Sequence, residues 1–409
     1  MTTTTLDAPL FRGDKFEIAS IGALLGFVAA AQVSIAAAGI MLFITIVCWA
    51  TVVAVHHERV QVPAMFWFLA AYGAATVVSA LASKEQMHSL VDCKQLVLFL
   101  IVPVVYRFAR GPRAITLTTV IISVGALSAL IGIIQYSFFK YDTLDKRAHG
   151  ALTHYMTYSG VLMLVTCAAV SHLLFGRKPR EAGAPAAARE WTGDRQWTAL
   201  VTPTLLIALA LTLTRNAWLG MSVAMVVLLS LTKPKLLLLL PIAVGLFLLI
   251  APTTVSSRFY SIFDPSNPTN RDRVAMLHYG SRMVADHPWT GVGPDMVKEV
   301  YSQYRDQEAV QAVNFHLHNV PMQIAAERGL PALIIWIGFI VVVVRDLLQR
   351  FRTSRYPSIA AAGLAAVAAM LVAGLFEYNF GDSEFLMLFL VLITLPFAAD
   401  REPIEAETR

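Results

Sequence analysis

Residues 114–138 read AITLTTVIISVGALSALIGIIQYSF and contain no charged side chain. A run of this length crosses the roughly 30 Å of hydrocarbon in a bilayer when it folds as an α-helix. Similar runs recur along the whole chain, of which 57% of residues are hydrophobic and only 14% are charged. A soluble globule needs more polar cover than this. The runs are continuous in Leu, Ile, Val and Ala and do not alternate with polar residues, which excludes a transmembrane barrel. The sequence predicts an all-α integral membrane protein.

We predict about twelve transmembrane helices, the first two of which come from dividing one apolar stretch near Ser34. The predicted spans are residues 16–33, 35–55, 63–83, 91–107, 114–138, 152–175, 197–213, 216–232, 234–251, 329–349, 357–377 and 383–399. This pattern predicts three parts. An N-terminal membrane region with about nine spans occupies residues 1–251, a large polar loop occupies 252–328, and a C-terminal membrane region with about three spans and a cytoplasmic tail occupies 329–409.

The orientation of the chain is predicted from the basic residues of its short loops. Arginines gather between Arg107 and Arg113 and again between Arg345 and Arg355. Short loops rich in Lys and Arg face the cytoplasm. With an even number of spans both termini then lie inside, and loop 252–328 faces outward. The basic loops also account for the formal charge of +5, which favours contact with anionic membrane lipids and not with nucleic acid.

The large loop is predicted to fold as a cap over the membrane region. Residues 274–285 and 296–304 have helical patterning, and the turn-rich sequence HPWTGVGP at 287–294 separates them. A loop of this length without structure of its own would be unusual.

Three arginines of the outer face are candidates for binding an anion. Arg215 lies between two spans that leave no room for a loop. An arginine in hydrocarbon costs about 2.5 to 3.5 kcal/mol, so intramembrane arginines tend to be functional, although a guanidinium that reaches lipid phosphate is the alternative. Arg271 and Arg273 begin a predicted helix, where two planar guanidinium groups and the helix N-terminus suit a diphosphate. Asp272 between them also fits a solvated salt bridge.

Two histidines, His316 and His318, lie just before a short helical stretch that leads into the span beginning at residue 329. Imidazole has a pKa near neutrality, so a histidine here can take a proton from a substrate hydroxyl. Capping of the helix is the structural alternative. The spacing also suggests a metal site, but no third ligand has convincing spacing, and the three cysteines all lie in or beside apolar spans. We therefore predict no metal and no cofactor.

Taken in order, these motifs resemble a known family. The series runs from TRNAWLG at 214–220 through NRDR at 270–273 and DHPWTGVG at 286–293 to His318-Asn319 and ERGL at 327–330. It is similar to the O-antigen ligase family, which also includes O-antigen polymerases and bacterial protein O-oligosaccharyltransferases. The resemblance covers most of the chain, and the order of the motifs is more specific than any one of them.

The resemblance implies a GT-C-like, metal-independent and inverting glycosyltransferase in the bacterial inner membrane, with its active site facing the periplasm. The implied donor is O-antigen on undecaprenyl diphosphate, and the implied acceptor is a hydroxyl of the lipid A-core oligosaccharide. Polymerase or protein O-oligosaccharyltransferase activity is the alternative. A secondary transporter, or a lipid-glycan binding protein without chemistry, would be a different class. A transporter should have two similar halves with polar or broken segments at midplane, and neither is visible.

The resemblance also assigns roles to particular residues. His318 would be the catalytic base, although the nearby His316 leaves open which of the two acts. Arg215 and Arg273 would hold the diphosphate, with Arg271 in reserve. The further predicted substrate contacts are Arg147, where the family often has an arginine but a juxtamembrane anchor fits equally, together with His316 and Asn319.

Overall fold

The computed structural model describes residues 15–176, 193–306 and 309–401. The predicted cytoplasmic tail beyond Arg401 lies outside these ranges. Within them the chain folds into helices, with one isolated β-bridge between Asp142 and Arg147 and no strand. The prediction of an all-α protein is confirmed for this part of the chain.

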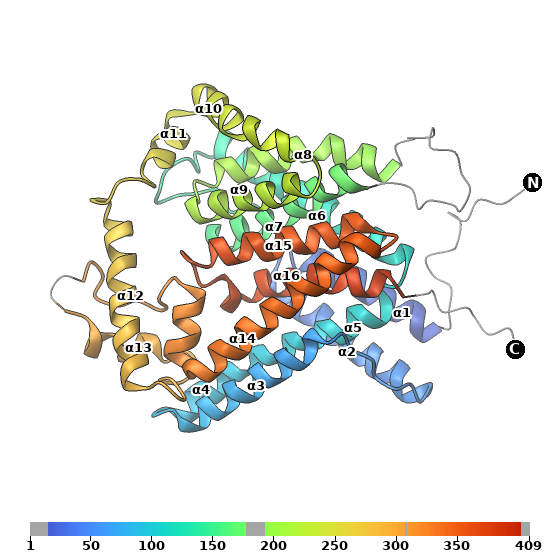
Figure 1. Ribbon diagram of the computed structural model, residues 1–409, viewed down its shortest axis with the longest axis horizontal. Coiled ribbons are helices and arrows are strands. Elements are labelled where there is room, and N and C mark those ends of the chain that lie inside the picture. Colours follow the sequence, from blue (N-terminus) through green and yellow to red (C-terminus); the bar gives the residue numbers. More distant parts are fainter. Residues whose placement is uncertain (1–14, 177–192, 307–308, 402–409) are drawn as a thin grey trace, which may run out of the picture.

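Most of the helices lie side by side along the long axis of the molecule (Figure 1). They are α1 (Lys15–Ala30), α2 (Ile35–Val55), α3 (Met65–Ala82), α4 (Gln86–Asp92) with η1 (Cys93–Leu100) and α5 (Ile101–Phe108), α6 (Pro112–Phe138), α7 (Tyr155–Phe175), α8 (Gly193–Leu211), α9 (Arg215–Ser230), η2 (Pro234–Leu239) with α10 (Leu240–Ile250), α14 (Val320–Thr353), α15 (Pro357–Ala373) and α16 (Ser383–Ala399).

Six helical segments of the described chain are long and apolar enough to cross a membrane. They are Ile35–Val55, Met65–Ala82, Gln86–Phe108, Pro112–Phe138, Tyr155–Phe175 and Val320–Thr353. Four shorter apolar helices accompany them, at Arg215–Ser230, Pro234–Ile250, Pro357–Ala373 and Ser383–Ala399. The chain is thus a multi-pass membrane protein, while the number twelve stays a prediction. The predicted division near Ser34 is confirmed, since the Ser34 hydroxyl caps α2 by accepting a hydrogen bond from Ala37 N.

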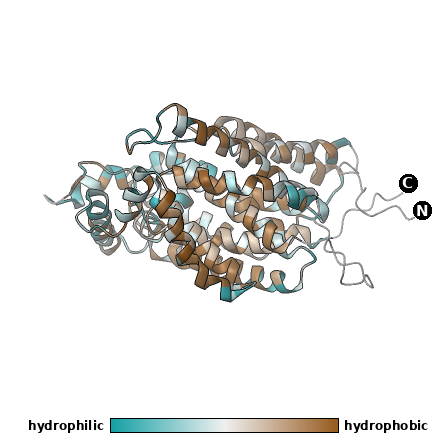
Figure 2. Ribbon diagram, turned by 90° about the horizontal axis from the view of Figure 1, so that it is seen from above, coloured by the Kyte–Doolittle hydropathy of each residue, from teal (hydrophilic) through white to brown (hydrophobic). Residues whose placement is uncertain are grey.

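Helices α7, α15 and α16 form the centre of the bundle. Helix α15 packs against α7, α9 and α16, and every residue of α16 from Glu384 to Ala399 is buried. Helix α15 is rich in alanine, and small side chains allow membrane helices to approach closely. By contrast α2 and α10 expose large apolar side chains such as Phe43, Leu249 and Ile250. Apolar residues cover the long helices in Figure 2, as expected of a surface in contact with lipid.

One end of the bundle, which we call the loop end, is covered by α11 (Thr253–Tyr260), α12 (Pro268–Asp286), α13 (Val297–Tyr304) and the first turns of α14 (Figure 1). These elements have an apolar core of their own that includes Met276, Tyr279, Met283 and Tyr301. Hydrophilic residues gather at this end in Figure 2. The helical patterns predicted at 274–285 and 296–304 are confirmed as α12 and α13.

The sequence HPWTGVGP fastens this cap to α14 at a kink. Gly329 has φ +79° inside α14, and Leu330 N beyond it donates to the carbonyl of Pro288. Val292 N and Gly293 N donate to the carbonyls of Ala326 and Glu327. A Cβ on Gly329 would lie 2.3 Å from the carbonyl oxygen of Trp289, so only glycine permits this approach. The motif is therefore a turn that docks on α14, which orients the first turns of that helix and the histidines before it.

Candidate active site

The chain leading into α14 is held in one conformation by its own polar groups. Asn319 is the N-cap of α14, where its Oδ1 accepts from Met322 N while its Nδ2 donates to the carbonyl of Leu375. Val320 N donates to the carbonyl of Gly374. His318 has φ +48°, in the left-handed region that histidine adopts more readily than most residues. These bonds fix the histidines against the segment that follows α15.

Glu377, in that segment, joins the two histidines. Its Oε1 lies 2.8 Å from His316 Nε2, and its Oε2 lies 2.9 Å from His318 Nδ1. Burial disfavours charge on Glu377, but hydrogen bonds from both histidines outweigh it and hold the pKa of this carboxyl far below its usual range. Burial likewise disfavours charge on His316, yet the bond to Glu377 raises the pKa of His316. The histidine-carboxylate group therefore pairs a stable anion with two imidazoles.

The structure brings both predicted histidines to this group, and each ring bonds Glu377 through a different nitrogen. With His318 Nδ1 bonded to Glu377, His318 Nε2 is the atom left to accept a proton. The ring of His316 lies beside it, with ring centroids 4.2 Å apart and the planes tilted by 40°. Glu377 lies far from the histidines in sequence, at the outer end of the predicted span 357–377.

Four arginines lie near this group at the loop end, and we call them the arginine cluster: Arg147, Arg215, Arg258 and Arg273. Burial and then the charges of the other three lower the pKa of Arg258 to about 10. None of the four forms an ion pair within 4.0 Å with a carboxylate of the described residues. The field of the cluster is therefore strongly positive.

Backbone carbonyls and aromatic rings hold these guanidinium groups in place. Arg215, which is 5% exposed, donates from Nη1 to the carbonyl of Ser261 at 2.7 Å, while its buried Nη2 has no partner. Arg258 Nε donates to the carbonyl of Leu213. Arg147 lies over the ring of Tyr155 at 4.3 Å, a cation–π contact. Neutral partners orient the arginines without cancelling their charge.

The remaining predicted residues lie differently. Arg273 is half-buried on α12, where burial lowers its pKa while the charge of Glu377 raises it. Arg271, two residues earlier, is exposed and is not brought into the cluster. Asp272 is buried, and burial raises its pKa while the nearby His318 lowers it. Its carboxylate thus lies within the cap, near His318 and Asn314, and not in a solvated pair with its neighbours.

Sequence reasoning missed Arg258. It lies on α11, a short helix with one charged residue that follows an apolar run, and no motif singles it out. Asn319, in turn, uses both ends of its amide to hold the backbone. A substrate contact for Asn319 stays a prediction.

A cavity of about 330 Å³ adjoins the histidine-carboxylate group. His316 and Glu377 line it, whereas no member of the arginine cluster does. The rest of the wall combines polar and apolar residues, most of them from α4, η1, α7, α9, α14 and the segment between α15 and α16. The site thus combines an arginine cluster with a cavity that reaches the histidine-carboxylate group.

Residues 200–337 match the family model described as O-Antigen ligase. This segment of the chain is therefore similar to the O-antigen ligase family. None of the curated proteins matches the chain. The match confirms the resemblance seen in the sequence, and it covers about a third of the chain.

The matched segment of this O-antigen ligase-like chain contains both histidines and three of the four clustered arginines. Arg147 and Glu377 lie outside it and join the site only through the fold. The family points to an enzyme that acts on a lipid-linked glycan.

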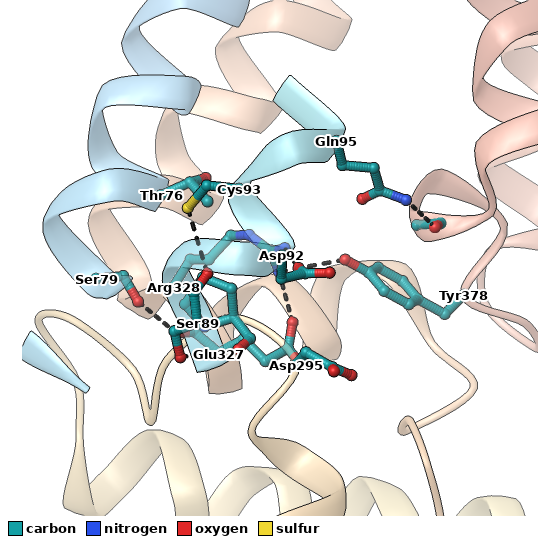
Figure 3. A network of polar contacts seen from close by, with 12 residues as sticks. Thr76, Ser79, Ser89, Asp92, Cys93, Gln95, Asp295, Glu327, Arg328 and Tyr378 are labelled. Atoms are coloured by element: carbon teal, nitrogen blue, oxygen red, sulfur yellow. Dashed lines mark hydrogen bonds and ion pairs between the residues drawn. The ribbon is translucent and has the colours of Figure 1, made fainter. Parts of the chain in front are cut away.

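A second charged group lies at the loop end, at the kink of α14 (Figure 3). Arg328, 5% exposed, lies 2.6 Å from the Glu327 carboxylate and 3.8 Å from that of Asp92, and it donates to the Tyr378 hydroxyl. Ser79 Oγ donates to the backbone carbonyl of Glu327. The ERGL motif of this O-antigen ligase-like chain thus ties α3, α4 and α14 together.

The histidine-carboxylate group also has the composition of a metal site. Ligand atoms of His316, His318 and Glu377 all lie within 4.8 Å of one another. The third ligand that spacing alone did not provide is thus supplied by the fold. In the O-antigen ligase-like structure these atoms hydrogen-bond one another, so a cation would have to replace both bonds.

Proposed function

We propose that the protein is an O-antigen ligase that transfers a glycan from undecaprenyl diphosphate to a sugar hydroxyl of the lipid A-core oligosaccharide, on the periplasmic face of the bacterial inner membrane. One observation carries this proposal. Four arginines that form no ion pair with a carboxylate in the described part of the chain lie near a histidine that a buried carboxylate orients.

The arginine cluster suits the diphosphate of the donor. Breaking the bond between the anomeric carbon and the diphosphate oxygen leaves negative charge on that oxygen. Fixed guanidinium groups that already point at the phosphate stabilise this charge as it develops. Arg215 and Arg273 would contact the phosphates. Arg147 and Arg258 would add to the positive electrostatic potential there. This supply of charge supports a metal-independent reaction, in which excess chelator leaves transfer unchanged.

The histidine-carboxylate group suits the acceptor. Glu377 holds the Nδ1 side of His318, so that Nε2 takes the proton of the attacking hydroxyl while the new bond to the anomeric carbon forms. The diphosphate leaves from the opposite face, which inverts the anomeric configuration. Assignment of the proton transfer to His318 rather than His316 follows from its place nearer Asp272 and α12, on the side of the arginine cluster.

The distribution of basic residues supports the orientation. Arg401 donates to the carbonyl of Tyr106, and Arg350 bonds Asp400, so these arginines gather where α16 ends. Helix α16 begins beside the active site at Ser383. Basic ends face the cytoplasm, which leaves the loop end in the periplasm. About twelve crossing helices in a GT-C-like arrangement would hold the lipid tails, and the cap would hold the reacting groups.

A strain that lacks the gene tests the function. If the protein is a ligase, gels of its lipopolysaccharide show bare core, and glycan accumulates on its lipid carrier. Core with a single repeat unit would instead assign polymerase activity. Normal lipopolysaccharide would remove both assignments and leave a protein transferase.

Complementation of that strain tests the catalytic residue. His318→Ala is expected to lose transfer by about 100-fold or more while the protein accumulates in the membrane. His278→Ala, a matched change at an exposed histidine on α12, should restore normal lipopolysaccharide. Transfer retained by His318→Ala would remove the catalytic claim.

A further inference from the structure

The cavity beside His316 has the size and chemistry of a sugar site. Its volume of about 330 Å³ falls within the range of small-molecule sites, about 300 to 1,000 Å³. Amide and hydroxyl side chains line it, among them Gln95, Asn216 and Thr157. Such groups donate and accept hydrogen bonds, as the hydroxyls of a sugar require.

Asn216 places a polar side chain in the cavity wall. The residue is only 7% exposed, and its side chain forms no hydrogen bond with another group of the described residues. Its amide is open to the cavity, so it is free to donate to and accept from a hydroxylated molecule bound there.

The charge of the cavity wall is opposite to that of the arginine cluster. Five carboxylates contribute to the wall, and Arg328 is its single guanidinium: the acids are Asp92, Asp295, Glu327, Glu377 and Asp382. Arg328 pairs with Asp92 and Glu327, Lys298 pairs with Asp295, and the histidines pair with Glu377. Asp382 accepts from Thr157 and Phe385 N and forms no ion pair with a lysine or arginine of the described residues, while His154 and His316 lie close enough to interact with it electrostatically.

We propose that this cavity binds the reacting sugar of the acceptor, and that its carboxylates select a neutral or amino-bearing sugar and exclude one that carries a carboxylate or phosphate. The inference rests on the proposed function, because it assigns the acceptor side of that reaction.

The position of the cavity supports the acceptor over the donor. In an inverting displacement the attacking hydroxyl and the departing phosphate lie on opposite faces of the anomeric carbon. His316 and Glu377 lie in the cavity wall, and none of the four clustered arginines does. A sugar in the cavity can therefore present a hydroxyl to the histidines while the diphosphate stays with the arginines. An anionic sugar there would meet uncompensated carboxylate charge, which costs binding energy.

The test uses the full-length protein in proteoliposomes, a donor with a glycan on undecaprenyl diphosphate, and three core acceptors. These acceptors differ only in the reacting sugar, which is a neutral hexose, an amino sugar or a uronic acid. Wild-type protein is expected to have a kcat/KM at least about 100-fold lower for the uronic acid. Equal use of all three would overturn the inference and leave the ligase standing. Transfer to none of them would remove the proposed function and the inference with it.

Two variants then locate the selectivity. Asp382→Asn is expected to raise the uronic acid-to-hexose ratio of kcat/KM by about tenfold, because the unpaired charge is removed. Asp382→Ser serves as a second variant, since both residues retain the cap of α16. The matched control is Glu384→Gln, a buried acid two residues later that does not line the cavity. A ratio that stays at the wild-type value in both Asp382 variants would overturn the assignment.

Asn216→Ala distinguishes acceptor from donor. Loss of its hydrogen bond should raise the KM for the acceptor about tenfold while the KM for the donor stays unchanged. A rise in the donor KM alone would make the cavity a donor site and overturn the inference. Melting curves in detergent confirm that each variant is folded.

Discussion

Two sets of buried arginines at the loop end differ in their partners. Arg328, at the kink of α14, lies against the carboxylates of Glu327 and Asp92 and the hydroxyl of Tyr378 (Figure 3). Arg215 and Arg258, which are buried to a similar degree, bond only backbone carbonyls and side chains without charge. Burying a charge is costly unless it is paired. Pairing makes Arg328 a part of the structure, whereas the lack of a carboxylate partner among the described residues is the reason for proposing the arginine cluster as an anion site.

The largest expected effect comes from removing Arg328, the arginine that is paired with carboxylates. Arg328→Ala leaves the buried Glu327 and Asp92 without their cation and should lower the free energy of unfolding by about 3 to 5 kcal/mol. The double variant Arg328→Met with Glu327→Gln removes both charges and should recover part of that loss. Thermal melting in detergent measures both. If the single variant melted like the wild type, Arg328 would not be structural, and the contrast between the two sets would fail.

The unpaired set should respond in the opposite way, with activity lost and stability kept. Arg273→Ala removes a charge that would stabilise the departing diphosphate, and we expect transfer to fall by about 100- to 1,000-fold. Because no carboxylate of the described residues pairs with Arg273, melting should not change much. Arg282→Ala, an exposed arginine on the same helix, is the matched control. A large fall in the melting temperature of Arg273→Ala would instead assign it a structural role.

Substitution of Glu377, the carboxylate that orients the histidines, should reduce transfer less than substitution of the histidines themselves. Glu377→Gln keeps the shape of the side chain but removes the charge that holds both histidines, and transfer should fall by about 10- to 100-fold. As a positioning residue it should lower kcat, leave the KM for the donor unchanged and alter the pH profile of the rate. Glu384→Gln again serves as the control. A changed donor KM with an unchanged pH profile would argue that Glu377 contacts the donor.

The sequence predicts the membrane class, the division near Ser34, the helices of the cap and the family, because hydropathy and motif order are local properties. It also singles out Arg215, Arg273, His316 and His318, which the fold brings to one end of the molecule. It cannot supply Glu377 as the partner of the histidines, because that contact depends on how α14 and α15 pack.

Arginines illustrate the same limit. Arg271 and Arg273 are equivalent in a motif, but about half a turn of helix separates them, which leaves the first exposed and the second half-buried near Glu377. Arg258 belongs to no motif and joins the cluster only because α11 folds back over Leu213. Which arginines lie in the site depends on side-chain direction and long-range packing, and local sequence does not determine either.

The smallest expected effect concerns pH and compares His316 with an exposed histidine. The pKa of His316 is raised above its ordinary value of 6.5 by Glu377, so their bond gives its full stabilisation below pH 6.5 and loses it as the pH rises through the raised pKa. Glu377, whose pKa is lowered, loses its contribution only in strong acid. The melting temperature of the wild type should therefore fall more between about pH 6 and 9 than that of His316→Asn. His278→Asn should keep the wild-type slope, and an equally steep fall in His316→Asn would show that the stabilisation comes from another group.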